Sequence, residues 1–275
     1  MFFSSKRLKE RAEGLEQLKD ILKDKNKALI IHYSCESFIT THGKTPRITS
    51  ICIRNLGSSQ TKSFSIHLQA QFEKMDFNDL TDDDYDVLEL KMLAEFSDYV
   101  NQHKDFKWIH WHMRDSNYGF EAIANRYRIL NGEPFEISED RKYDFPLILE
   151  RIYSYGYEKD LPNGKLLNLA DSNKISTIDA LKGIEESRAF ENKEYLKLHK
   201  SSLRKVDIID TIIERTDKNE LKVCARKKDI YGLTVLGIIE IIKNNWLLVI
   251  LWSIIFWILG AATEPFIQRI FGTGN

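Results

Sequence analysis

Ser34 and Glu36 stand at the end of an apolar, β-prone segment, two residues apart, where both would point to the same face of a strand. Two acids at this spacing can hold a divalent metal ion that activates water and neutralises a transferring phosphate. Serine takes one of the two positions here, so Glu36 alone carries the expected charge. Gly43, Pro46 and Arg47 follow and predict a loop. The stretch thus indicates a strand and turn suited to metal chemistry, with one carboxylate missing.

The segment "FKWIHWHM" contains a second set of candidate metal ligands. If residues 106–113 form a strand, His110 and His112 point to the same face, a spacing found in some zinc sites. His32 or Glu36 on a neighbouring strand would supply a third ligand. Two imidazoles without an evident third ligand seldom make a zinc site, so the alternative is that both histidines hydrogen-bond within the sheet or to the next loop.

Aromatic and basic side chains provide material for a binding surface. Aromatic rings beside arginine suit stacking on a base, and a basic helix face suits contact with phosphate. The alternatives are that the rings belong to the core and that the basic face is solvated. The candidates for binding a nucleic acid or nucleotide are Trp108, Trp111, Tyr118, Arg126, Lys200, Arg204 and Lys205.

The elements that must position these residues follow from periodicity and turn signals. Apolar β-prone runs predict strands over 28–33, 47–55, 61–68 and 106–113. A cap at Thr81 or Asp82 and apolar helical spacing predict a long helix after it. Further helices are expected over 118–130, 146–154, 176–188 and 195–214, and leucines at helical spacing predict an amphipathic helix within 1–27.

Three strands, a helix, a strand and then helices is the order of the RNase H-like fold, and two segments carry a resemblance to the proofreading-type DEDD exonucleases. "SCESFITTHGKTPRITSICI" resembles their first motif, with Ser34 at the Asp position and Glu36 at the Glu position. "WIHWHMRDSNYGFEAIANRY" is similar to the second motif, with Tyr118 as the aromatic residue and Gly119 in place of the Asp. The third motif is placed near "HKSSLRKVDIIDTI", where the acid position falls on Lys205, or on Asp207 after a shift. The resemblance covers roughly residues 28–215.

The resemblance implies an α/β fold with a mixed sheet and flanking helices, and it implies a site that needs about four carboxylates for two metal ions. An active enzyme would hold Mg²⁺ or Mn²⁺ and would need substitute acids. Each substitute is more often an ordinary surface acid. The catalytic candidates are Glu36, Asp115 and Asp207, with Asp210, Glu185 and Glu186 as further substitutes.

Overall composition sets wider limits on function. A chain of 275 residues with 43% hydrophobic and 29% charged residues is ordinary globular material, and its formal net charge of −1 gives no overall attraction to nucleic acid. The three cysteines, Cys35, Cys52 and Cys224, are odd in number and far apart, which favours a reducing compartment.

The carboxyl-terminal end predicts a membrane anchor. Residues 246–262 carry no charge and, as a helix, would reach about 25 Å, which is short for a membrane span. Trp246, Trp252 and Trp257 lie on several sides of this helix, which favours a lipid-facing helix. The alternative is a buried core helix. Ser253 and Gly260 mark a small-residue face that predicts self-association. Basic residues before the span outnumber Arg269 beyond it, which places the large domain in the cytoplasm, at the inner membrane.

The sequence therefore divides into an amphipathic helix (1–27), an RNase H-like cytosolic domain (28–215), a juxtamembrane segment (216–245), a transmembrane helix (246–262) and a short tail (263–275). Two functions remain open. One is a membrane-anchored sensing or binding protein with a catalytically degenerate exonuclease-like domain, similar in architecture to bacterial anti-phage defence effectors; the other is a membrane-tethered, metal-dependent nuclease. The expected partners are membrane lipid, a nucleic acid or nucleotide, a second copy of the chain, and a protein at the N-terminal helix.

Overall fold

A five-stranded mixed sheet forms the centre of the molecule, in the order β3-β2-β1-β4-β5. A computed structural model describes residues 6–37, 45–77, 79–114 and 117–271. β1 and β2 pair antiparallel, as do β2 and β3, whereas β4 runs parallel to both β1 and β5. The strands are β1 (Ala28–Cys35), β2 (Ile48–Asn55), β3 (Thr61–Ser65), β4 (Lys107–His110) and β5 (Lys142–Asp144). The predicted α/β class, with a mixed sheet and flanking helices, is confirmed.

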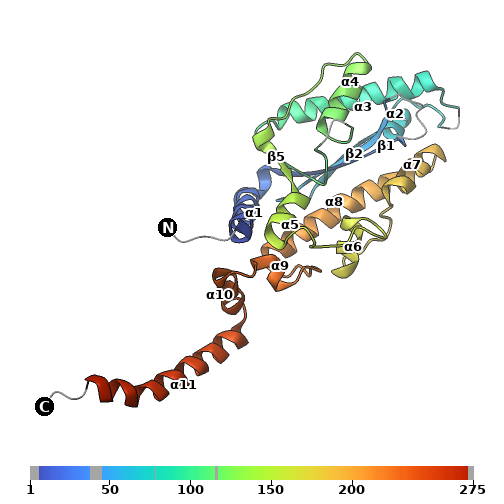
Figure 1. The fold of residues 1–275 in the computed structure, drawn as a ribbon. Coiled ribbons are helices and arrows are strands. Elements are labelled where there is room, and N and C mark those ends of the chain that lie inside the picture. Colours follow the sequence, from blue (N-terminus) through green and yellow to red (C-terminus); the bar gives the residue numbers. More distant parts are fainter. Residues whose placement is uncertain (1–5, 38–44, 78, 115–116, 272–275) are drawn as a thin grey trace.

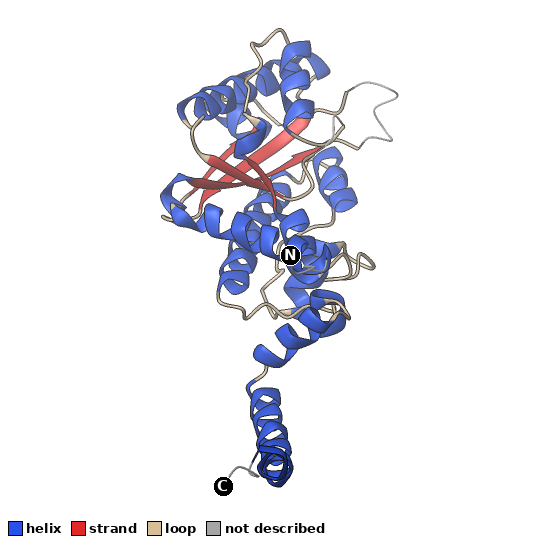
Figure 2. Ribbon diagram, turned by 60° about the vertical axis from the view of Figure 1, so that its left-hand side comes forward, coloured by secondary structure: helices blue, strands red, loops and turns tan. Residues whose placement is uncertain are grey.

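Helices cover both faces of this sheet, as Figures 1 and 2 show. Because the inner strand β1 is covered on both sides, its apolar run is continuous rather than alternating. Two short 3₁₀ turns, Lys25–Lys27 and Glu139–Arg141, precede β1 and β5. The helices are α1 (Lys6–Lys23), α2 (Ile66–Phe72), α3 (Asp82–Gln102), α4 (Phe120–Ile129), α5 (Phe145–Tyr153), α6 (Lys165–Ser172), α7 (Gly183–Glu191), α8 (Tyr195–Asp217), α9 (Lys227–Tyr231), α10 (Val235–Lys243) and α11 (Trp246–Phe271).

Each face of the sheet has its own hydrophobic core. Leu29, Ile31 and Tyr33 of β1 pack with α2, α3 and α4 on one face, whereas Ala28 and Ile30 pack with α1, α5, α6 and α8 on the other. Alternation along the strand thus assigns each β1 side chain to one core. His32 and Ser34 continue the second set, so they face α7 and α8 at the carboxyl end of the strand.

Three predicted elements end at different residues from those expected. β3 stops at Ser65, because Ile66, Gln69 and Ala70 bury one side at helical spacing and form α2 instead. β4 stops at His110, and His112 has a φ of 56°, which is incompatible with an extended strand. The helix expected over 176–188 is wrong in its first half. There a turn closes from Ala180 N–H to the Thr177 carbonyl, and α7 begins at Gly183.

The N-terminal helix is part of the packed body and not a separate appendage. Leu18 and Ile21 of α1 are buried in the second core, and Arg11 donates to the Ile152 carbonyl at the end of α5. At the other end, Leu221 is buried in the same core, and Cys224 N–H donates to the Tyr157 carbonyl. The body therefore begins within α1 and continues beyond α8.

Helix α11 extends away from the body in Figure 1. Its described side chains are exposed on every side, with Trp246 69% and Trp257 74% exposed. No single helix among the described residues is both long enough and apolar enough to cross a membrane. The segments Val235–Lys243 and Trp246–Ala261, bent by 110°, meet that requirement together. The prediction that residues 246–262 alone form a membrane span is thus not supported by this helix taken by itself.

Candidate functional site

Three serine hydroxyls occupy the position where the sequence placed the first catalytic acid. Ser34 at the end of β1 and Ser50 on β2 both contact Ser202 of α8, with Oγ–Oγ distances of 3.1 Å and 2.9 Å. All three side chains are buried. Because hydroxyls can donate and accept, Ser202 links the other two serines through two hydrogen bonds, and neutral hydroxyls occupy the position of the expected carboxylate.

A buried ion pair lies beside these serines. The Lys205 ammonium is 2.7 Å from Glu186 Oε2, and Ser201 donates to Glu186 Oε1 at 2.6 Å. His32 Nε2 is 3.7 Å from the same carboxylate. Burial alone would raise the pKa of Glu186, but the Lys205 ammonium and the contact with His32 together outweigh burial and lower this pKa to about 2. Burial also lowers the pKa of His32, so the imidazole is neutral and Lys205 carries the compensating charge.

Glu36 and Asp207, the two described residues among the three catalytic candidates, are engaged by arginines. Glu36 accepts from the Arg47 backbone N–H at 3.0 Å and from Arg47 Nη1 at 3.1 Å, so each carboxylate oxygen already has a partner. Asp207 accepts from Arg204 at 2.8 Å and is 3.6 Å from Arg54. Glu36 and Asp207 therefore sit in separate ion pairs. The third candidate, Asp115, lies outside the described residues.

Arg126 belongs to a buried carboxylate cluster. Its guanidinium contacts both oxygens of Glu89, which is fully buried, and donates to Asp86 at 2.8 Å. Glu89 also accepts from the Ile48 N–H at 2.7 Å, which ties α3 to β2. Burial raises the pKa of Glu89 to about 7 despite the arginine. The sequence does contain a signal for this cluster, because Glu89 shares the apolar face of its helix with Met92 at helical spacing.

The proposed stacking residues are mostly interior. Trp108 is fully buried and Trp111 is 8% exposed, so neither offers a ring face to a ligand. Tyr118 stacks on Tyr33 at 4.5 Å and donates its hydroxyl to the Tyr33 carbonyl at 3.0 Å. Among the basic candidates Lys205 is buried, whereas Lys200 is exposed and the Arg204 side chain is one-third exposed.

The two histidines of the predicted metal site do not point together. β4 ends at His110, whose Nδ1 accepts from the Met113 N–H at 3.2 Å, and His112 leaves the strand and approaches Arg114. Within the described ranges, no group of three or more His, Cys, Asp or Glu side chains is arranged to hold a metal ion. Glu36, His110 and His112 therefore do not form a metal-binding cluster.

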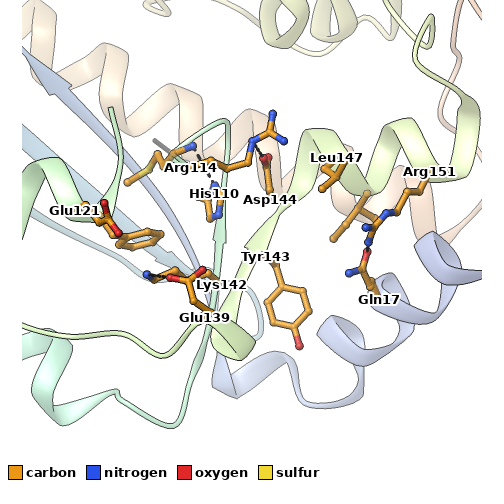
Figure 3. A pocket seen from close by; sticks show the side chains of 13 residues that line it. Gln17, His110, Arg114, Glu121, Glu139, Lys142, Tyr143, Asp144, Leu147 and Arg151 are labelled. Atoms are coloured by element: carbon orange, nitrogen blue, oxygen red, sulfur yellow. Dashed lines mark hydrogen bonds and ion pairs between the residues drawn. The ribbon is translucent and has the colours of Figure 1, made fainter. Parts of the chain in front are cut away.

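A pocket of about 390 Å³ opens at the carboxyl ends of β4 and β5 (Figure 3). Ligand sites in open α/β sheets commonly lie at this edge. Figure 3 shows His110 near the centre of the lining, between Arg114 and Asp144 on one side and Lys142 and Glu139 on the other. Sequence reasoning named only His110 as a site candidate among the residues of this pocket. Arg114 and Glu121 lie within the segment that is similar to the second motif but were given no role there, and the lining residues of β5, α1 and α5 belong to no motif.

The pocket's polar groups are fixed by one another. Arg114 Nε is 2.5 Å from Oδ2 of the buried Asp144, and Lys142 Nζ is 2.5 Å from Glu139. Burial raises the pKa of Asp144, which Arg114 opposes. Burial lowers the pKa of His110 to about 3, so the ring is neutral. Since Nδ1 accepts a hydrogen bond, the ring proton is on Nε2, and His110 is a donor there.

The arrangement offers an imidazole donor, three cations (Arg114, Lys142 and Arg151) and three carboxylates (Glu121, Glu139 and Asp144) around one cavity, without a metal-binding cluster among the described residues. Such a set can hold a small polar ligand by hydrogen bonds and ion pairs. The chain matches no protein-family model, no curated protein and no solved structure.

Proposed function

We propose that the chain is a membrane-attached binding protein whose RNase H-like domain recognises a nucleic acid or nucleotide without cleaving it. The order of elements from β1 onward supports the RNase H-like assignment, as does the mixed sheet: three strands, two helices, a strand, a helix, a fifth strand and then further helices. The α/β body carries the ligand site, and the apolar α10–α11 pair carries the membrane attachment.

The single observation that carries the non-catalytic assignment is the Lys205–Glu186 pair. A two-metal nuclease neutralises its carboxylates with cations from solution. Here a lysine on α8 neutralises the buried carboxylate at 2.7 Å, and serines replace the acid of β1. Adding a divalent cation beside an ammonium in this interior would be strongly unfavourable, because like charges at low dielectric repel.

The pocket at the ends of β4 and β5 is the proposed ligand site. Its volume of about 390 Å³ lies within the usual range of about 300–1,000 Å³ for small-molecule sites. Arg114 and Lys142 suit a phosphate group. The Nε2–H of His110 and the carboxylate of Glu121, which also lines the pocket, form a donor and an acceptor suited to the edge of a base. A mononucleotide or the terminal nucleotide of a strand fits this chemistry.

Membrane attachment rests on the exposed apolar surface of α10 and α11. Leu233, Val235 and the described side chains of α11 present a continuous apolar surface that a soluble monomer would not leave in water. Basic residues lie on its amino-terminal side, so the positive-inside rule places the α/β body in the cytoplasm.

Fluorescence anisotropy with labelled mononucleotides and short single-stranded DNA and RNA tests the ligand site. We expect Arg114→Gln and Lys142→Gln each to weaken binding by roughly tenfold or more, since hydrogen bonds to charged groups contribute about 1.5–3 kcal/mol. Arg128→Gln is the matched control, because Arg128 is exposed on α4 and does not line this pocket. Equal affinity of all three variants and the wild type, or no binding by the wild type, would refute the proposal.

A further inference from the structure

The first turns of α1 and the short helix α9 come together at the end of the body from which α10 and α11 extend (Figure 1). Arg7 donates through Nε to the Asp229 carbonyl at 3.2 Å, and the Arg11 guanidinium lies 5.0 Å from the centre of the Tyr231 ring. These residues are more than 200 positions apart in the chain, so no local pattern connects them. The contacts bring the first turns of α1, with their exposed lysines, close to α9 and its cations.

Those cations form a basic surface, defined by Lys6, Lys9, Arg226, Lys227 and Lys228. Each of these residues is exposed, and the Lys6 side chain is 92% exposed. Inward-facing Arg7 and Arg11 use their guanidinium groups to hold α1 against α5 and α9. At the exposed surface Lys6 is 3.9 Å from Glu10 and Arg226 is 3.6 Å from Asp229, so these two cations are partly offset by acids. With a formal charge of only −1 on the whole chain, this concentration of positive charge is local.

The basic surface has a fixed position relative to the apolar helices. Gly232 ends α9 with a φ of 80°, and Thr234 caps α10 by accepting from the Gly237 N–H at 3.2 Å. A Cβ added at Gly237 would lie 2.4 Å from the Gly232 carbonyl oxygen, so only glycine allows this approach. Beyond the junction, the exposed Leu233, Val235 and Ile238 begin the apolar surface.

We propose that the basic surface formed by α1 and α9 binds the anionic headgroups of the bilayer in which α10 and α11 are embedded. This inference rests on the proposed membrane attachment. It adds that α1, which the sequence connects to no membrane element, is a lipid contact. Positive charge directly beside an exposed apolar segment is complementary to a bilayer with negative headgroups, because cations remain at the surface while the apolar side chains enter it.

Co-flotation of the full-length chain with vesicles tests the inference. One set of vesicles is phosphatidylcholine alone, and the other contains about one-third phosphatidylglycerol. Each basic residue near an anionic surface contributes about fivefold to the partition constant at moderate salt. We therefore expect Lys227→Gln/Lys228→Gln and Lys6→Gln/Lys9→Gln each to lower partitioning to the anionic vesicles by roughly 25-fold, with little change on the neutral ones. Raising the salt should weaken the wild type toward the variants.

The matched control is Lys197→Gln/Lys200→Gln, which removes the same charge from exposed positions in the first turns of α8, beside α7 in Figure 1. If either test variant partitions to anionic vesicles as the control does, the inference is overturned. If all variants bind neutral and anionic vesicles equally well, membrane attachment still holds, and only the role of the basic surface in lipid binding is refuted. Binding to neither kind of vesicle would refute the attachment and, with it, the inference.

Discussion

Replacing Lys205 with methionine removes the charge that neutralises the buried Glu186 carboxylate. The two side chains are 7% and 5% exposed, so water cannot take over the role of the ammonium. The pKa of Glu186 is lowered from 4.5 to about 2, which corresponds to about 3 kcal/mol of stabilisation at neutral pH. Breaking a buried ion pair on one side usually destabilises by about 3–5 kcal/mol. We expect a loss in that range for Lys205→Met at pH 7.

The loss should depend on pH in a defined direction. In the wild type the pKa of Glu186 is depressed, so the pair stabilises the fold above about pH 4.5 and the stabilisation disappears as the pH falls toward 2. In the variant, burial acts without the ammonium and raises the pKa of Glu186. The difference in unfolding free energy between the wild type and the variant is then largest near pH 7, and it shrinks as the Glu186 carboxyl becomes protonated at lower pH.

Urea unfolding of a chain ending at Asn244 measures this effect, since α11 contributes no side chain to either core. Lys197→Met is the control, because that lysine is exposed in an ordinary pair with Glu194 and should change stability by less than about 0.5 kcal/mol. The double variant Lys205→Met/Glu186→Gln should regain much of the loss. A cost below about 1 kcal/mol for Lys205→Met, or a cost that is the same at pH 4 and pH 7, would refute this account of the ion pair.

Three further outcomes follow from the carboxyl-terminal helices. The full chain should fractionate with membranes, whereas a chain ending at Asn244 should be soluble and keep its unfolding midpoint; full-length protein in the soluble fraction at low salt would contradict this. The full chain should be oligomeric in mild detergent, and Ser253→Leu/Gly260→Leu should reduce its mass, since a Cβ at Gly260 meets none of the described atoms of its own chain within 4 Å. A monomeric wild type would disprove self-association. Gly237→Leu should open the α9–α10 junction to proteolysis, unlike Gly183→Leu in open space, and equal cleavage of both would disprove close packing there.

Local sequence patterns predict most of the elements. Thr81 and the acids after it predict the start of α3, and the structure has a capping box there, with Thr81 Oγ1 accepting from the Asp84 N–H. The apolar spacing of α8 is equally local, and this helix begins at Tyr195, as predicted. Such features depend on residues within a few positions of one another, so one sequence is enough to find them.

Elements that depend on a single backbone angle were not predictable. "FKWIHWHM" looks like one strand throughout, yet β4 ends at His110, three residues before the predicted end, and a positive φ at His112 separates the two histidines. The region before α7 reads as helical, yet Asp179 adopts a φ of 71°. Non-glycine residues adopt this conformation rarely, so propensity favours the wrong structure at both places.

The candidate site was only partly accessible to sequence reasoning, because its pairs join distant segments. Glu186 was recognised as a spare carboxylate and Lys205 as the residue in an acid position, but their contact depends on how α7 lies beside α8. The pocket is similar: Asp144 and Arg114 meet across the ends of two strands. No periodicity reports such contacts, which arise from tertiary packing.

Hydrolysis in the presence of Mn²⁺ tests the central claim most directly. End-labelled single-stranded DNA and RNA are incubated with the purified chain and with Glu36→Ala, and products are followed by gel electrophoresis while bound Mn²⁺ is followed by electron paramagnetic resonance. We expect no cleavage above background and no saturable Mn²⁺ site for either protein. Lys205 supplies the positive charge beside the buried Glu186 carboxylate, and Arg47 engages both oxygens of Glu36. Cleavage by the wild type that Glu36→Ala abolishes, together with loss of a bound Mn²⁺, would contradict it.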